Sequence, residues 1–254
     1  MKKIAIVLIL AMSASLLAAC GATASEDLLS DGVLSVGTNA EFPPFEYIGD
    51  DGEPDGFDIA LVKAIGEELG VEVTIENMEF ASLVASVGTK VDIAAAGMTV
   101  TEEREQEVTF SEPYYDAVQY VIVPADSDIA SAEDLIGKKI GVQLGTTGDF
   151  IAAEVEGAEV ATYNKAVDAV SDMLNDRVDC VIIDKNPALV FAEKYPDEVV
   201  SLDGADFGFE VEQYAIALPK GNEELAEKIN GAISTLKENG TFDELVSEYI
   251  EENE

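Results

Sequence analysis

The sequence predicts an α/β fold that is divided into two units with largely parallel sheets. Stretches in which apolar and polar residues alternate are followed by stretches in which apolar residues recur with the helical period. This order is typical of parallel sheets covered by helices, and it occurs twice along the chain. With 254 residues, of which 48% are hydrophobic, the chain is long and apolar enough to bury a sizeable core.

The first unit is expected to follow the order strand–helix–strand–helix–strand. Apolar residues recur every four positions from Phe57 to Leu69, which favours an amphipathic helix, and Gly70 is a suitable residue to end it. The alternation over residues 71–75 favours a strand. The expected strands of this unit are residues 33–37, 71–75 and 91–95, and the expected helices are residues 57–69 and 83–87.

The second unit repeats the pattern, and Pro124 ends its first strand. Residues 131–134 have the form of a capping box that opens a short helix. The expected strands are residues 120–123, 139–143, 158–162 and 178–183, and the expected helices begin at about residue 149 and cover 166–174 and 187–194. The tail is expected to add a strand at 213–218 and two helices at 223–238 and 242–251, separated by Asn239 and Gly240.

The charge and the composition exclude several classes of protein and site. The net charge of −38 would repel phosphate backbones and anionic lipids, so we expect no nucleic-acid partner and no basic membrane-binding patch. The chain has no His, which excludes a Ser-His-Asp triad and a His-based zinc site, and its two Cys cannot form a disulfide framework. We expect no metal and no cofactor. Cys180 lies in an apolar stretch and is expected to be a buried core thiol.

Residues 1–19 have the features of an export signal. Lys2 and Lys3 are followed by sixteen uncharged residues, which is short for a bilayer span. Small residues then precede Cys20, as in the lipobox of bacterial lipoproteins, where the Cys thiol receives a lipid and becomes the new N-terminus. An ordinary signal peptide with an accidental Cys20 and a membrane anchor are the alternatives. Residues 20–29, small and polar, would be a flexible tether.

A series of motifs in a fixed order resembles the family-3 extracellular solute-binding proteins of amino-acid ABC importers. The resemblance covers residues from about 30 to 249. The motifs are the segments 37–47, 56–59, 97–104, 110–115 and 145–149, Asp184 at the end of a strand, and 239–242.

The resemblance implies a type II periplasmic-binding-protein clamshell, in which two α/β lobes are joined by two hinge strands. Lobe 1 would comprise residues 30–117 plus 214–254, and lobe 2 residues 118–213. The hinges would lie at residues 115–120 and 210–214. Closure of such lobes around a ligand fits a cleft between rigid bodies.

The resemblance also implies a site for the two charged groups of an amino acid. Arg104 would bind the carboxylate through its planar fork, whereas the residues alone favour a surface ion pair with Glu103 or Glu105. Asp184 would accept the ammonium from the opposite lobe, with a plain helix N-cap as the alternative. One zwitterion would then bridge both lobes and favour closure.

The remaining site residues would complete the binding cleft. The hydroxyl and backbone N–H of Thr99 would join Arg104 on the ligand, as would the backbone N–H of Thr147 at a helix N-terminus. Phe42 and Phe80 would sandwich the ligand side chain, with core packing as the alternative, and Gly97 would offer its carbonyl to the ammonium. The full set implied by the resemblance is Asn39, Phe42, Phe80, Gly97, Met98, Thr99, Arg104, Thr146, Thr147 and Asp184.

The acidic segment 50–56 suggests a calcium loop at first sight. An EF-hand loop requires Glu at its twelfth position, and counting from Asp51 reaches Val62. A solvated hairpin turn is therefore the better interpretation.

We therefore expect a receptor and not an enzyme. It would be a monomer, lipid-anchored on the outer face of the cell membrane, and would deliver a free amino acid to ABC permease subunits. A polar or basic amino acid is favoured, because the net charge attracts cations. A prephenate (cyclohexadienyl) or arogenate dehydratase on the same scaffold, with Glu41 as its acid, is one alternative. A sensory domain is another, but it would continue into a signalling region and this sequence stops at Glu254.

Overall fold

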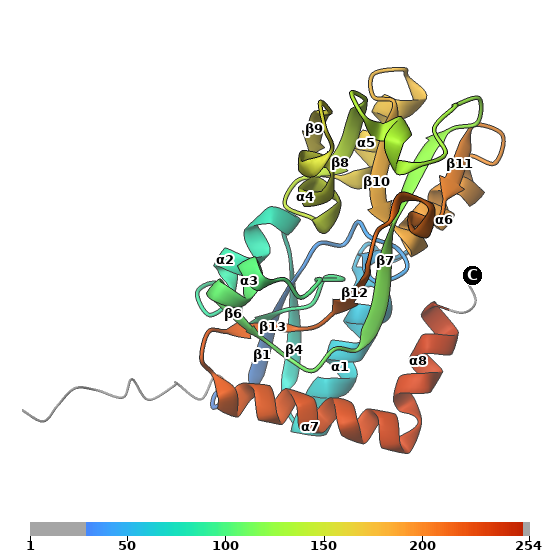
Figure 1. The fold of residues 1–254 in the computed structure, drawn as a ribbon. Coiled ribbons are helices and arrows are strands. Elements are labelled where there is room, and N and C mark those ends of the chain that lie inside the picture. Colours follow the sequence, from blue (N-terminus) through green and yellow to red (C-terminus); the bar gives the residue numbers. More distant parts are fainter. Residues whose placement is uncertain (1–28, 251–254) are drawn as a thin grey trace, which may run out of the picture.

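The computed structural model describes residues 29–250 of the chain (Figure 1). The predicted signal peptide, Cys20, nearly all of the tether and the end of the helix predicted at 242–251 lie outside the described residues. Within residues 29–250, none of the helices is both long enough and apolar enough to cross a bilayer.

The first unit contains a five-stranded sheet in the order β4-β1-β5-β13-β6. β1 pairs in parallel with β4 and β5, whereas β13 runs antiparallel between β5 and β6, so the sheet is mixed and not parallel throughout. Its strands are β1 (Val33–Thr38), β4 (Glu72–Asn77), β5 (Ile93–Ala94), β6 (Val108–Phe110) and β13 (Ala217–Pro219).

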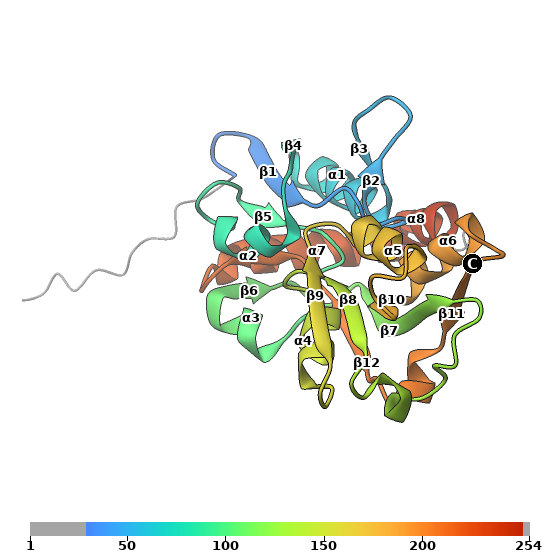
Figure 2. The same cartoon turned by 90° about the horizontal axis from the view of Figure 1, so that it is seen from above.

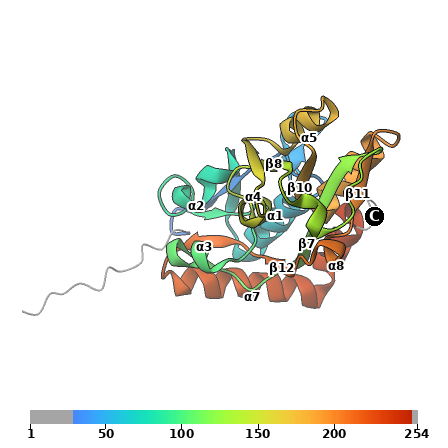
Figure 3. The ribbon, with the colours of Figure 1, turned by 45° about the horizontal axis from the view of Figure 1, so that its top comes forward.

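Helices from both ends of the chain belong to the first unit. α1 packs against both C-terminal helices, α7 and α8, and Figure 3 shows α7 running along the base of this unit. Its helices are α1 (Phe57–Leu69), η1 (Phe80–Ser82), α2 (Leu83–Ser86), α3 (Glu102–Glu107), α7 (Glu223–Asn239) and α8 (Thr241–Tyr249).

The second unit contains a six-stranded sheet whose main order is β11-β7-β10-β8-β9, with β12 paired to β7. β8, β9 and β10 are parallel, and β7 is antiparallel to all its neighbours. Its strands are β7 (Tyr115–Pro124), β8 (Lys139–Gln143), β9 (Glu159–Tyr163), β10 (Cys180–Asp184), β11 (Val199–Leu202) and β12 (Val211–Tyr214). Its helices are η2 (Ala132–Leu135), α4 (Thr147–Glu154), α5 (Ala166–Leu174), α6 (Lys185–Lys194) and η3 (Gly204–Phe207).

The α/β prediction is confirmed, and so is the hairpin at residues 50–56, but one predicted strand is divided in two. The strand predicted at 213–218 is two strands, because Tyr214 pairs with Tyr115 on β7 whereas Ala217 pairs with β5 and β6 in the other sheet. The acidic segment after β2 (Tyr47–Ile48) turns back into β3 (Pro54–Asp55) as a hairpin that projects from the molecule in Figure 2. Cys180 is fully buried, and burial raises the pKa of its thiol to about 12, as expected for a core residue.

β7 and β12 run side by side between the two units (Figures 1 and 3). The predicted hinge segment 115–120 falls on β7, and the segment 210–214 falls on β12 except for residue 210, which precedes it. The predicted lobe boundaries stay a prediction. Where the strands leave the first unit, the rings of Tyr115 and Tyr214 pack edge-on against Phe45, with centroids 4.9 and 5.1 Å away. These three aromatic rings pack together at the point where β7 and β12 join the first unit.

Candidate functional site

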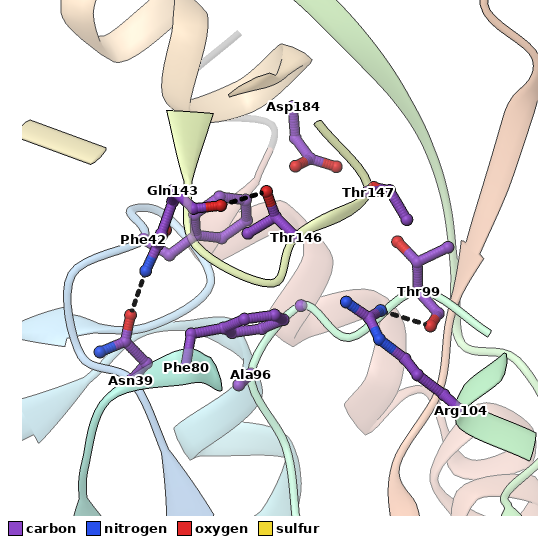
Figure 4. A pocket seen from close by; sticks show the side chains of 11 residues that line it. Asn39, Phe42, Phe80, Ala96, Thr99, Arg104, Gln143, Thr146, Thr147 and Asp184 are labelled. Atoms are coloured by element: carbon purple, nitrogen blue, oxygen red, sulfur yellow. Dashed lines mark hydrogen bonds between the residues drawn. The ribbon is translucent and has the colours of Figure 1, made fainter. Parts of the chain in front are cut away.

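A pocket lies between the two units, at the carboxyl ends of several strands (Figure 4). The chain leaves β1, β8 and β10 at this edge, which is where open α/β sheets bind their ligands. Nine of the ten residues expected from the sequence line it. The lining residues are Asn39, Phe42, Phe80, Ala96, Gly97, Thr99, Arg104, Gln143, Thr146, Thr147 and Asp184.

Arg104 enters the pocket from α3, a short helix capped by Thr101. Its side chain donates hydrogen bonds to the carbonyl of Thr99 at 2.7 Å and, across to the second unit, to the carbonyl of Gly145 at 2.9 Å. Arg104 is only 6% exposed, so the alternative of a surface ion pair is wrong. Burial lowers the pKa of Arg104, and the negative charges of Glu212 and Asp184 oppose that effect.

Asp184 faces the pocket from the end of β10. It occupies the N-cap position of α6, but its side chain makes no capping hydrogen bond and accepts one from the Tyr214 hydroxyl instead. Burial, followed by the negative charge of Glu212, raises the pKa of Asp184 to about 7. A cationic ligand group placed beside Asp184 would therefore favour its ionised form.

The threonine hydroxyls are already engaged within the protein. Those of Thr99 and Thr147 both donate to Glu212, at 2.7 and 2.8 Å, and that of Thr146 donates to the carbonyl of Gln143 at 2.8 Å. The single hydrogen of the Thr99 hydroxyl is donated to a carboxylate in this structure, and the expected contact of this hydroxyl with a ligand stays a prediction. Thr147 is the first residue of α4, so its backbone N–H lies at a helix N-terminus as expected.

Met98 is the one predicted site residue whose side chain does not line the pocket. It is fully buried and packs with Leu83, Val87 and Val108 in the core of the first unit. The side chain of Met98 therefore belongs to the core of the first unit, although its neighbours Gly97 and Thr99 line the pocket.

Gln143 and Ala96 line the pocket but were not predicted. Gln143 is 5% exposed and donates to Asn39 at 2.9 Å, and Asn39 in turn donates to the carbonyl of Met78 at 2.9 Å. Two amides from opposite units thus form one wall of the pocket (Figure 4). The signal that could have found Gln143 is a polar residue at the carboxyl end of a predicted strand.

Buried carboxyl groups surround Asp184 on the side of the first unit. Glu46 is fully buried, and both its oxygens have no hydrogen-bond partner among the described residues. Burial raises its pKa well above the usual value, and Asp58 and Asp184 raise it further. Asp58 accepts hydrogen bonds from the backbone N–H of Gly97 and the hydroxyl of Tyr114, and burial raises its pKa to about 6. The first unit therefore places two buried carboxyl groups near the pocket, and burial disfavours the ionised form of each.

Gly97 occupies a position where a side chain would not fit. Its φ is +51°, and an added Cβ would lie 3.0 Å from the ring of Phe42 and 3.4 Å from that of Tyr214. We expect Gly97→Ala to lower the free energy of unfolding by about 1–3 kcal/mol and to weaken ligand binding by displacing Phe42. Urea unfolding and calorimetry measure the two effects.

Gly231→Ala is the matched control, since a Cβ there meets no atom within 4 Å and the residue lies inside α7. This control should be stabilised by about 0.5–1 kcal/mol. A Gly97→Ala variant as stable as the wild type, with unchanged affinity, would contradict the steric argument.

The chain matches the model of bacterial extracellular solute-binding proteins, family 3, over residues 34–252. The chain belongs to this family. This solute-binding protein is 34% identical to the arginine-binding extracellular protein ArtP of Bacillus subtilis, over 98% of each chain. It is also 31% identical to the L-cystine-binding protein TcyJ of Escherichia coli, over 86% of this chain and 83% of that one.

Solved structures resemble this solute-binding protein over most of its length. A mutant of the arginine-binding protein of T. maritima has a TM-score of 0.81 and 40% identity, covering 87% of this chain and 96% of its own. An ancestral arginine-binding protein bound to arginine has a TM-score of 0.81 and 39% identity, covering 86% and 98% of the two chains. These neighbours confirm the predicted type II fold.

Proposed function

We propose that this protein is an extracellular receptor that binds a free amino acid between its two units and delivers it to an ABC importer. The observation that carries the proposal is that Arg104 and Asp184, from opposite units, line the same pocket. An α-amino acid has a carboxylate and an ammonium close together, and burying either group unpaired is costly. Arg104 and Asp184 would neutralise the two groups and would tie the units together.

Among amino acids we propose arginine, or a related basic amino acid, as the ligand. Several relatives and structural neighbours are named as arginine-binding proteins. Arg104 is the only cationic residue among those that line the pocket, whereas Asp184 lines it and the acidic Glu46, Asp58 and Glu212 lie near it. The rings of Phe42 and Phe80 offer faces on which a guanidinium can stack.

Entry of an amino acid requires the pocket to enlarge. The cavity volume is about 10 Å³, close to the smallest volume that holds a single water molecule. The Gly145 carbonyl accepts a hydrogen bond from one nitrogen of the Arg104 guanidinium, and this contact joins the two units. When the units move apart, a ligand carboxylate would replace the Gly145 carbonyl as the partner of Arg104. The units would then close again around the ligand.

A screen of the twenty amino acids by thermal shift, followed by calorimetry, tests this function. A ligand that binds only the folded state raises the melting temperature by mass action, so arginine should give the largest rise. If no amino acid shifts the melting temperature and calorimetry detects no binding, the proposal fails. The dehydratase alternative has no support from the relatives named above, and incubation with prephenate or arogenate should yield no product.

We also propose that the receptor is a monomer held to the outer face of the cell membrane by lipid on Cys20. The export signal and the small residues before Cys20 support the anchor, and the name of the family supports an extracellular place. Mass spectrometry of the membrane fraction should find an acylated N-terminal Cys20. An intact Met1 or an unmodified Cys20 would exclude the anchor.

A further inference from the structure

Glu212 occupies a central position that the proposed ligand contacts do not use. It lies on β12, one of the two strands that join the units. A single oxygen, Oε2, accepts hydrogen bonds from the Thr99 hydroxyl at 2.7 Å, the Thr147 hydroxyl at 2.8 Å and the side-chain amide of Gln119 at 3.4 Å. Thr99 comes from the first unit and Thr147 from the second, so one carboxylate holds a hydroxyl from each.

Glu212 lies behind the two threonines as seen from the pocket. Thr99 and Thr147 line the pocket, and both also line a neighbouring groove of about 540 Å³. Glu212 lines the groove but not the pocket. Glu212 therefore acts on a ligand in the pocket through the threonines and not by contact.

The hydrogen bonds to Glu212 determine whether the hydroxyls of Thr99 and Thr147 can donate or only accept hydrogen bonds in the pocket. An ionised carboxylate only accepts hydrogen bonds, and a hydroxyl has one hydrogen to donate. Thr99 and Thr147 each donate this hydrogen to Glu212, and Thr147 also accepts a hydrogen bond from Gln119 at 3.1 Å. Only oxygen lone pairs remain for a ligand, so both threonines act as acceptors beside Asp184.

The charge of Glu212 also acts on the two ionic residues of the pocket. It is the largest of the charges that oppose the lowering of the Arg104 pKa, and it raises the pKa of Asp184. The other polar groups that face Asp184 are the hydroxyl of Tyr214, the amide of Gln119 and the carboxyl of Glu46.

We propose that Glu212 is a specificity-determining residue that sets the pocket to accept hydrogen bonds at the amino end of the ligand. It does so by holding the hydroxyls of Thr99 and Thr147 as acceptors. The pocket then selects a charged α-ammonium, with three hydrogens to donate, over an α-hydroxyl with only one. This inference rests on the proposed amino-acid-binding function and extends it to a residue outside the pocket.

Glu212→Leu tests the inference, because this side chain has a similar size and accepts no hydrogen bond. The hydroxyls of Thr99 and Thr147 are then free to donate into the pocket. Calorimetry at pH 8 should show arginine binding about 5–10-fold more weakly. The 2-hydroxy analogue of arginine, in which a hydroxyl replaces the ammonium, should bind equally well or better. Discrimination between these two ligands therefore falls.

The pH profile separates this role from a merely structural one. With the Asp184 pKa at about 7, the Kd of the wild type for arginine should rise about tenfold from pH 8 to pH 6. Without the Glu212 charge the pKa of Asp184 falls, so the rise in Glu212→Gln should be only about two- to threefold. Glu210→Gln, an exposed neighbour on the same groove, is the matched control and should keep the wild-type profile.

A Thr99→Val/Thr147→Val background completes the test by removing both hydroxyls. In that background, Glu212→Leu should no longer alter the discrimination between arginine and its 2-hydroxy analogue. Unchanged discrimination in Glu212→Leu together with an unchanged pH profile in Glu212→Gln would overturn the inference, as would an equal loss of discrimination when Glu212→Leu is made in the valine background. If the wild type binds no amino acid, it is the proposed function that fails.

Discussion

Arg104→Ala should raise the Kd for arginine by at least about 100-fold, the largest loss that we expect from a single side chain. The guanidinium is 6% exposed and is the only cationic side chain among the pocket-lining residues. Its removal would leave the ligand carboxylate buried without a counter-charge, which costs about 3–5 kcal/mol. Titration calorimetry at pH 8 measures the loss directly.

A second variant at this position shows whether the paired hydrogen bonds or the charge of Arg104 matters. Arg104→Lys keeps the charge and loses the paired hydrogen bonds, so an intermediate Kd is expected. Arg177→Ala is the matched control, because this arginine is mostly exposed and pairs with Asp172 on the surface. An Arg104→Ala protein that folds and binds arginine within about threefold of the wild type would refute the site.

Asp184→Asn should weaken arginine binding by about 100-fold at pH 8 and yet stabilise the free protein. The asparagine cannot neutralise the ligand ammonium, so binding loses a buried, charge-assisted hydrogen bond. The same substitution removes a carboxylate whose ionised form is disfavoured by burial. Binding and stability should therefore move in opposite directions.

The pH dependences of binding and stability have opposite signs. Binding needs ionised Asp184, so affinity is full above about pH 8 and falls as the pH drops through 7. Stability behaves otherwise, because the pKa of Asp184 is raised from 3.8 to about 7 on folding. The contribution of Asp184 to the free energy of unfolding is highest below about pH 4 and declines as the pH rises through 7.

Urea unfolding without amino acid at pH 4 and pH 8 checks the stability effect of Asp184→Asn. The variant should match the wild type at pH 4 and exceed it at pH 8. Asp197→Asn, an exposed substitution in the turn after α6, should change neither property. Wild-type affinity that stays constant from pH 8 to pH 6 would rule out Asp184 as the partner of the ammonium.

The parts of the fold that follow from short-range pattern could be predicted from the sequence. The recurrence of apolar residues every four positions from Phe57 to Leu69 predicted α1, and the turn before residue 149 predicted α4. The position of β13 could not be predicted, because it pairs with β5 and β6, which lie more than a hundred residues earlier. Nothing in its own residues reveals those partners.

The same distinction applies to the candidate site. Arg104 and Asp184 could be assigned because they lie in recognisable motifs. Glu212 could not, since it owes its place to Thr99 and Thr147 from other elements, whereas the only sequence signal for Gln143 is its position at the end of a predicted strand. Met98 shows the limit of a motif, which transfers a stretch of residues without saying which of them faces inward.

The wall formed by Asn39 and Gln143 has a consequence for the breadth of recognition. A carboxamide has nearly the same size and shape after a half-turn, but its donor and acceptor exchange places. The main-chain carbonyls of Met78 and Asn164 each accept a hydrogen bond from one of these amides, so rotating either side chain would place its oxygen against a carbonyl oxygen. The wall is therefore held in one orientation and presents a fixed polarity to a guest.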